Sequence, residues 1–276
     1  MRLIRVALLL VIFLGAACGR SDQPAPLTVT YVANTGFLIE CGGKKILIDA
    51  LFGGFEADWY HVPPGGIVDL MTAARPPFDN VDIIAVTHAH TDHFNARMVT
   101  DHLVNNRRGI LVCPAQAAQA LETDPRYHDV KDRIRIMAAR RDSTAELTVA
   151  GVEIKALGTP HEHSADSHRD VEHLEYLFTV GGRVIYHTGD GEMNDVRRYQ
   201  AYGFGEKPID LAFVCWWDAG DRLTFRQQLI HDIIRPERVI LMHMLPNRPP
   251  IGNPERQQTV AKEVILPQLC LQSWGP

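Results

Sequence analysis

The side chains best suited to metal chemistry lie in one short segment, residues 87–93, with the sequence THAHTDH. Its candidate ligands are His88, His90, Asp92 and His93. Histidines at positions i and i+2 project to the same side of an extended backbone, so His88 and His90 can bind one ion together. Asp92 and His93 follow where the chain turns, and they can face a second ion. Neutral imidazoles with a carboxylate suit zinc or a similar first-row metal.

The flanking segments predict where this motif lies. Residues 81–86 before it form a continuous apolar run rich in β-branched side chains, which predicts a buried strand. Residues 95–105 after it predict a helix. The motif would then lie on the loop at the carboxyl end of a strand, where open α/β sheets place their binding sites.

Three later predicted strands also end in side chains that can bind metals. The side chains are His161 and His163 after the predicted strand 152–157, Asp190 after the predicted strand 183–186, and His243 after the predicted strand 239–242. Asp49 ends an earlier predicted strand, 45–49. It is either an ordinary turn residue or a side chain that orients a ligand histidine.

Apolar patterning predicts the remaining elements. The other predicted strands are 27–32, 36–40, 110–113, 147–149, 176–180 and 209–215, and the other predicted helices are 115–122, 193–202, 225–234 and 254–269. The polar segment 123–143 has no clear pattern. The connection 51–80 is long for a compact domain and contains Trp59, Tyr60 and His61. It either overhangs the metal site and contacts substrate, or its aromatic side chains only pack the loop onto the domain.

Length and composition indicate one globular α/β domain over residues 27–276. Of the 276 residues, 46% are hydrophobic and 22% charged, and the net charge is −5. A nucleic-acid-binding protein needs a positive footprint, which this charge pattern lacks, so no nucleic-acid partner is expected. The basic residues Arg133, Arg135, Arg140 and Arg141 are expected on a solvated face. Three cysteines in or beside apolar strands, Cys41, Cys113 and Cys215, are expected to be buried thiols.

The N-terminus has the features of an export signal. Residues 1–17 contain two arginines, a short apolar core and a small-residue end, which predicts a cleaved signal peptide. The next residue, Cys18, fits a bacterial lipoprotein signal, in which this cysteine is lipidated and residues 18–26 link the lipid to the domain. The expected location is the bacterial cell envelope, with membrane attachment through Cys18. Cleavage without lipidation would instead give a soluble secreted or periplasmic protein.

The ordered set His-x-His-x-Asp-His, then His, then Gly-Asp, then His resembles the metallo-β-lactamase superfamily. The resemblance extends from about residue 27 past residue 243. It implies an α/β fold, the four-layer αββα metallo-β-lactamase sandwich, with a binuclear metal site at the edge between the sheets. Within the superfamily, segments 176–190 and 241–243 are most similar to the branch with sugar-phosphate lactonases and a phospholipase D.

The resemblance also implies a ligand set for two divalent ions. His88, His90 and His161 would bind the first ion, while Asp92, His93 and His243 would bind the second and Asp190 would bridge both. His163 is the alternative to His161. The expected ions are zinc, with manganese or iron as alternatives.

The implied chemistry is hydrolysis by a hydroxide held between the two metals, with Asp92 and Asp190 as catalytic residues. An aspartate at the bridging position, where antibiotic-hydrolysing members commonly have cysteine, favours an ester, lactone or phosphodiester substrate, either a small molecule or lipid-like. Candidate substrate contacts are Tyr60, His61, His163, Trp217, Asp218 and Asn247.

Three other functions are less consistent with the residues. An iron oxidoreductase on the same fold usually has an acidic residue where His90 stands. A cysteine hydrolase on Cys113 or Cys215 lacks a nucleophile-elbow sequence. A non-catalytic surface lipoprotein that binds metal or a partner is the remaining alternative to the hydrolase.

Overall fold

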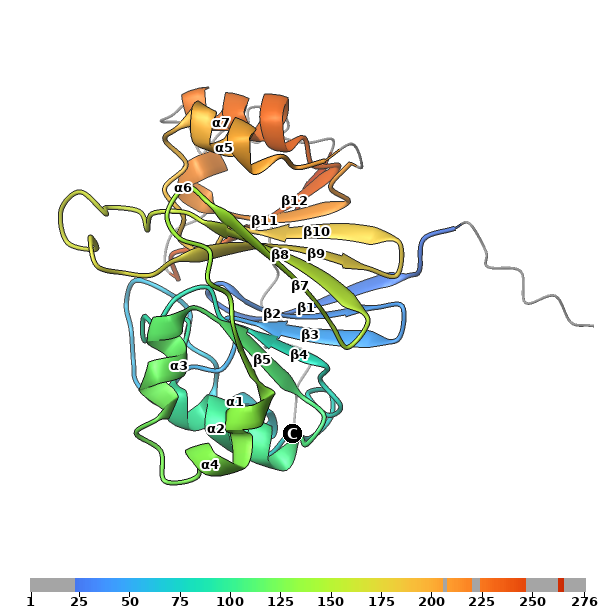
Figure 1. Ribbon diagram of the computed structural model, residues 1–276, viewed down its shortest axis with the longest axis vertical. Helices are drawn as coiled ribbons and strands as arrows, with labels where there is room; N and C mark the ends of the chain where they lie inside the picture. Colours follow the sequence, from blue (N-terminus) through green and yellow to red (C-terminus); the bar gives the residue numbers. More distant parts are fainter. Residues whose placement is uncertain (1–22, 206–207, 220–223, 247–262, 266–276) are drawn as a thin grey trace, which may run out of the picture.

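Two β-sheets stacked face to face form the centre of the protein, and helices cover the outer face of each sheet (Figure 1). The computed structural model describes residues 23–205, 208–219, 224–246 and 263–265. The arrangement is helices, sheet, sheet, helices, and both sheets are mixed. The predicted α/β class with a four-layer αββα sandwich is confirmed.

The first sheet has six strands in sequence order. They are β1 (Leu27–Ala33), β2 (Gly36–Cys41), β3 (Lys44–Ile48), β4 (Ile83–Ala85), β5 (Ile110–Cys113) and β6 (Ile134–Ile136). The first three pair antiparallel, and β3 to β6 pair parallel. Its outer face is covered by α1 (Gly65–Thr72), α2 (Ala96–Asn105), α3 (Ala115–Leu121) and α4 (Tyr127–Val130), the last followed by the short η1 (Lys131–Arg133).

The second sheet has seven strands in the order β13-β12-β11-β10-β9-β8-β7. They are β7 (Thr144–Val149), β8 (Val152–Gly158), β9 (Leu174–Val180), β10 (Arg183–His187), β11 (Leu211–Cys215), β12 (Arg238–Met242) and β13 (Glu263–Ile265). Strands β7 to β10 pair antiparallel, and β10 to β13 pair parallel. The helical segments on this side are α5 (Val196–Tyr202), α6 (Trp216–Ala219), α7 (Thr224–Leu229) and the π-helical turn η2 (Ile230–Ile234).

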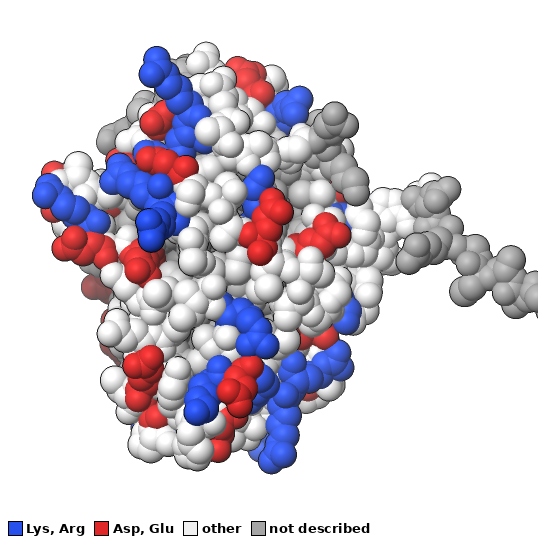
Figure 2. Space-filling model, viewed as in Figure 1, with Lys and Arg blue, Asp and Glu red and all other residues white. Residues whose placement is uncertain are grey.

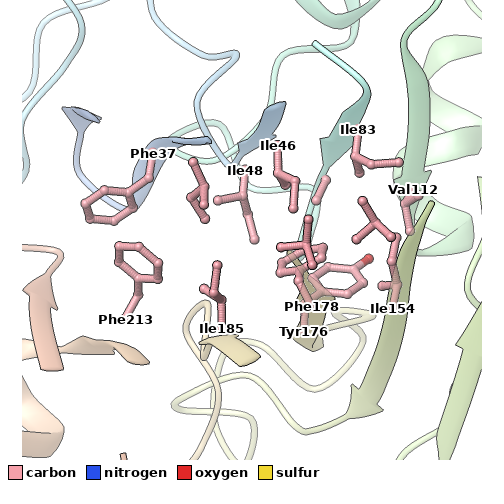
Figure 3. Packing of buried hydrophobic residues seen from close by; sticks show 14 of the residues in the cluster. Phe37, Ile46, Ile48, Ile83, Val112, Ile154, Tyr176, Phe178, Ile185 and Phe213 are labelled. Carbon is pink, nitrogen blue, oxygen red and sulfur yellow. The ribbon is translucent and has the colours of Figure 1, made fainter. Parts of the chain in front are cut away.

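Apolar side chains from the facing surfaces of the two sheets interdigitate to form the central core (Figure 3). The rings of Phe37 and Phe213 lie 4.2 Å apart across this interface. A polar contact also crosses it, because the buried Tyr176 hydroxyl donates to Val86 O at 3.0 Å. Close packing of this kind fixes the sheets relative to each other, and therefore fixes the strand ends that meet at their shared edge.

Two segments differ from the sequence predictions. The helix predicted over 254–269 is wrong at Glu263–Ile265, which pairs in parallel with β12 as strand β13; the rest of that prediction lies outside the described residues. The segment 123–143, which had no assignment, contains α4, η1 and the edge strand β6. Pairing with a neighbouring strand, rather than local pattern, decides whether such short edge segments become strands.

The long connection 51–80 is only partly irregular, because it contains α1. Its aromatic residues form a chain of ring contacts, with Phe55 lying 6.5 Å from Phe52 and 6.3 Å from Tyr60 between ring centroids. Trp59 points outward and is 73% exposed. Both interpretations of the loop therefore hold in part. Its aromatic side chains pack it onto the domain, and Tyr60 also contacts the candidate ligand His243.

The described cysteines Cys41, Cys113 and Cys215 are free and buried, which confirms that they are buried thiols. Burial raises the pKa of Cys113 to about 12, so this thiol stays protonated. Cys18 and Cys270 lie outside the described residues.

A fully buried carboxylate, Glu175, lies between the second sheet and α5. It accepts hydrogen bonds from the hydroxyls of Tyr186 and Tyr199, the latter at 2.6 Å. A Cβ atom at Gly191 would lie 2.1 Å from Glu175 Oε1, so the turn that follows β10 requires a glycine at that position. Burial outweighs the two tyrosine hydrogen bonds and raises the pKa of Glu175 to about 7.

We expect Glu175 to make stability depend on pH. Its pKa is about 7 in the fold against an ordinary 4.5, so between these values the folded chain binds a proton that the unfolded chain lacks. The free energy of unfolding should therefore fall as pH rises through this window, by about 3 kcal/mol in total. Urea denaturation at pH 5 and pH 8 should show this loss in the wild type and not in Glu175→Gln.

Glu153→Gln, which changes an exposed glutamate on β8, is the control and should follow the wild type. Parallel pH profiles for the wild type and Glu175→Gln would show that Glu175 does not contribute the effect.

Candidate metal centre

The candidate ligands converge at the edge shared by the two sheets. His88, His90, Asp92 and His93 follow β4 in the first sheet, while His161, Asp190 and His243 follow β8, β10 and β12 in the second. Each strand is buried and rigid, so the position of the loop after it is determined by sheet packing. All seven residues named from the sequence are brought together here.

The seven side chains form two groups. His88, His90 and His161 offer ligand atoms that all lie within 4.8 Å of one another, and the same limit holds for the group Asp92, His93, Asp190 and His243. His163, the alternative to His161, is exposed in the loop after β8 and belongs to neither group.

Asp190 lies between the two groups. Its Oδ2 atom is 3.3 Å from His93 Nε2 and 3.5 Å from His243 Nε2, both in its own group. The same oxygen is 3.7 Å from His161 Nε2 in the other group. One carboxylate oxygen therefore faces candidate ligand nitrogens of both groups.

The ring nitrogens are oriented as metal ligands require. His161 Nδ1 lies 2.6 Å from Glu162 O, and His93 Nδ1 lies 2.9 Å from Asp49 Oδ2, so each Nδ1 holds a proton and donates it to that oxygen. The Nε2 of His161, whose pKa is about 4, is then a bare lone pair, while the Nε2 of His93 faces Asp190 Oδ2 at 3.3 Å. Among the described residues, neither buried Nε2 atom has a hydrogen-bond partner. Buried ring nitrogens without a hydrogen-bond partner fit a site for a metal ion.

The ionisation of the centre also fits cation binding. Burial, together with the neighbouring His93, lowers the pKa of His88 well below its ordinary value, so this imidazole is neutral. Burial lowers the pKa of His161 to about 4. Burial alone would raise the pKa of Asp190, but the facing His93 and His243 lower it well below its usual range. Neutral imidazoles and ionised carboxylates are the forms that bind divalent ions.

Asp49 supports the motif from the end of β3. Its carboxylate accepts from Thr87 N at 2.8 Å and from Thr87 Oγ1 at 2.6 Å, in addition to its contact with His93 Nδ1. Of the two interpretations open for Asp49, orientation of a ligand histidine is the one the structure favours. Asn34 supports the second group in the same way, because its Nδ2 donates to Asp92 Oδ2 at 3.1 Å.

Two further histidines hold the turn that contains Asp190. His173 Nε2 accepts from Asp190 N at 3.0 Å while its Nδ1 lies 3.2 Å from Thr159 O. His187 Nδ1 accepts from Gly189 N at 3.0 Å. Sequence reasoning gave neither residue this role. The only local signal was the high density of histidines around the predicted strand ends.

The candidate substrate contacts lie in different places. Tyr60 and Trp217 have ring centroids 6.0 Å and 4.8 Å from that of His243, so both lie beside the second group. His61 is half-buried. Asp218 is buried and forms an ion pair with Arg226 at 2.6 Å. Asn247 lies outside the described residues.

Another histidine, His168, covers the first group. Its ring stacks on His161 with centroids 4.5 Å apart and lies 4.9 Å from the ring of His90. The first group is therefore flanked by an imidazole, whereas the second group is flanked by the aromatic rings of Tyr60 and Trp217.

Comparison with known proteins identifies the superfamily that the sequence motif resembles. A model of the beta-lactamase superfamily domain matches residues 28–243, which is more than half of the chain. A UPF0173 metal-dependent hydrolase of Pyrococcus furiosus is 27% identical over 86% of this chain and 95% of its own length.

Solved structures share the fold. The metallo-beta-lactamase fold protein YhfI from Bacillus subtilis superposes with a TM-score of 0.57 at 17% identity, covering 88% of this chain and 96% of its own. A metallo hydrolase from Ignicoccus hospitalis gives a TM-score of 0.54 at 19% identity, covering 87% of this chain and 95% of its own. With the matched residues running from β1 to His243 and so including every candidate ligand, the chain belongs to the beta-lactamase superfamily.

Proposed function

We propose that this metal-dependent hydrolase binds two divalent metal ions, with zinc as the preferred metal. At this binuclear site it cleaves an ester, lactone or phosphodiester bond of its substrate. His88, His90 and His161 are assigned to one ion, Asp92, His93 and His243 to the other, and Asp190 to both. The main support is the position of Asp190 Oδ2, which is 3.7 Å from His161 Nε2 and 3.3 Å from His93 Nε2. Manganese or iron would fit the same nitrogen and oxygen ligands.

Ions bound in these groups would lower the pKa of a coordinated water from ~15.7 toward ~7 and supply a nucleophile at neutral pH. The protein's own part is to orient this water and the substrate. Asp92 is the carboxylate nearer to solvent, with a side chain 13% exposed against 8% for Asp190. We assign Asp92 to orient the attacking water, and Asn34 to hold Asp92 in place through its hydrogen bond to Oδ2.

The surroundings of the second group favour a substrate with an apolar part. Tyr60 and Trp217 present aromatic rings beside His243. Aromatic side chains bury a large apolar area and still offer a polar atom for orientation. This wall suits the acyl or lipid-like part of a small-molecule ester, lactone or phosphodiester.

Removing a ligand from either group should abolish hydrolysis and reduce metal content. Wild type reconstituted with zinc should bind two ions per chain, and His90→Ala should bind about one. Both His90→Ala and Asp190→Ala should lose at least about a hundredfold in kcat on a panel of esters, lactones and phosphodiesters.

His128→Ala, at an exposed histidine far from the motif, is the control and should match the wild type in metal and activity. Full activity in either ligand variant, or a wild type that binds two ions and hydrolyses nothing on the panel, would contradict the proposed function. The second outcome would favour a non-catalytic metal-binding protein.

Asp49→Asn should weaken metal binding without removing a ligand. The amide still accepts a hydrogen bond from His93 Nδ1 but no longer has the charge that raises the basicity of the ring, so zinc affinity should fall about ten- to hundredfold. Competition against a chromophoric chelator measures this directly. Asp129→Asn, at an exposed carboxylate, should leave the affinity unchanged, and an unchanged affinity in Asp49→Asn would exclude the orienting role.

We also propose that the chain is exported and anchored to a membrane of the bacterial cell envelope through lipid on Cys18. The proposal rests on the signal-like residues 1–17 and on the small residues before Cys18. Among the described residues, no helix has the length and apolar character needed to cross a bilayer.

Substitution of Cys18 by serine tests this anchor. In cells that express the full chain, wild type should sediment with membranes and Cys18→Ser should be released into the soluble or secreted fraction. Cys270→Ser is the matched control and should remain with the membranes. Equal membrane association of Cys18→Ser and wild type would exclude a lipid anchor at this position.

A further inference from the structure

A cavity of about 450 Å³ lies beside the first ligand group. His161 lines it together with His168 and His173. Most of its wall comes from two segments distant in sequence: residues 136–141, which begin at the last residue of β6, and residues 168–174, which include His168 and His173 and end at the first residue of β9. The cavity therefore shares a wall with a proposed metal ligand, while most of its lining takes no part in metal binding.

The segment that contains Arg140 is fixed to the strand leading to His161. Asp142 N donates to Gly158 O at 2.8 Å, and Gly158 N donates to Ser143 O at 2.9 Å. A Cβ at Gly158 would lie 2.0 Å from Arg140 O, so this approach requires glycine. The position of this wall is thus tied to the backbone that positions the ligand.

The opposite segment is fixed to α3. Gln116 N donates to a Glu172 carboxylate oxygen at 2.8 Å, and Glu172 N donates to Gln116 Oε1 at 2.9 Å. Gln116 Nε2 also donates to Asp170 O at 2.6 Å. One oxygen of the Glu172 carboxylate is therefore turned toward the N-terminal end of α3.

Arginines outnumber acids on the cavity wall, three to two. The charged residues lining the cavity are Arg140, Arg141, Arg169, Asp170 and Glu172. Within the described part of the chain, neither Arg140 nor Arg169 forms an ion pair, and Arg141 lies 4.0 Å from its nearest carboxylate, that of Asp142. On the face in Figure 2, charged side chains of both signs gather where the loop between β8 and β9 projects from the body. The part of that loop that lines the cavity carries one arginine and two acids, Arg169, Asp170 and Glu172, so the positive excess of the lining comes from Arg140 and Arg141 on the opposite segment.

We propose that this cavity is a subsite for an anionic group of the substrate, a carboxylate or a phosphate, bound by Arg140 and Arg141. Planar guanidinium groups match both anions, and a cationic pocket raises the local concentration of an anionic substrate. The proposal rests on the proposed hydrolase function, because the scissile bond lies at the metal centre and the anionic group lies in the cavity.

The two sites are close enough for one small molecule. His161 contributes to the first ligand group and to the cavity wall, and the ring of His168 lies 4.5 Å from that of His161. A substrate bound at both sites would extend from the metal centre along the cavity wall that contains His161 and His168. The subsite would therefore select for a charged group a few bonds from the scissile carbonyl or phosphoryl.

A series of three 4-nitrophenyl esters tests the selection. Their acyl chains have equal length and end in a methyl, a carboxylate or a phosphate group. Zinc-loaded wild type should have a higher kcat/KM for at least one of the two charged esters than for the methyl ester. The ratio of kcat/KM for the preferred charged ester to kcat/KM for the methyl ester should fall at least about tenfold in the double variant Arg140→Ala/Arg141→Ala. It should fall less in Arg140→Lys/Arg141→Lys, which keeps the charge.

The control is Arg135→Ala, which changes an exposed arginine that does not line the cavity. Its ratio should equal that of the wild type. Which charged ester is preferred identifies carboxylate or phosphate as the ligand group. A wild type that cleaves the three esters without preference, or a ratio unchanged in the double alanine variant with its fold intact by circular dichroism, would overturn the subsite.

Calorimetry separates failure of the subsite from failure of the hydrolase. Inorganic phosphate and glutarate are titrated into zinc-loaded wild type, the double alanine variant and Arg135→Ala. Metal-centred binding is common to all three proteins, so at least a tenfold loss for one anion confined to the double variant supports the subsite, even if no ester is cleaved. Equal affinities in all three proteins would exclude it.

Discussion

Five imidazoles and two carboxylates point into one small and mostly buried space, and this crowding is the constraint on which the rest of the structure depends. In a medium of low dielectric constant, facing lone pairs and negative charges repel unless a cation lies among them. His93 shows how strongly this site favours a positive charge. Burial lowers its pKa, yet the facing Asp190 and Asp92 raise that pKa well above the ordinary value. A divalent ion would offset the same negative charge more fully than a protonated His93, because it carries two positive charges.

The same residues that position the centre also join the two sheets. Asn34, in the turn between β1 and β2 of the first sheet, accepts from His243 N at 3.1 Å and donates to Asp92. His243 belongs to the second sheet. Asn34, Asp49 and His243 all adopt left-handed backbone conformations, with φ of 48°, 45° and 56°. Non-glycine residues in this region are strained, and such strain persists where surrounding contacts fix it, as they do at this edge.

Much of the fold, the candidate ligands and one of the two interpretations of Asp49 followed from the sequence, but the supporting contacts of His173 and Asn34 did not. Continuous apolar runs such as 110–113 identify buried strands because every side chain on them must be buried, and the spacing of His88, His90 and Asp92 is itself a local signal. His173 and Asn34 act through contacts that form only after segments distant in sequence meet. His173 and Asp190, for example, are 17 residues apart in the sequence. The edge strands β6 and β13 likewise depend on a partner strand, so residues 134–136 gave no clear pattern and residues 263–265 were predicted as helix.

The two sides of the centre differ in chemistry, and this difference limits the substrate more than the metal ligands do. Tyr60 and Trp217 give the second group an apolar, aromatic border, whereas His168 and the arginine-lined cavity border the first group. The lining of this cavity holds three arginines and two acids, and among the described residues Arg140 forms no ion pair. If the proposed subsite binds an anion, a substrate that fills both sides would be apolar at one end and anionic at the other, with the hydrolysed bond between them. Neither a purely apolar ester nor a compact polyanion would then match both sides at once.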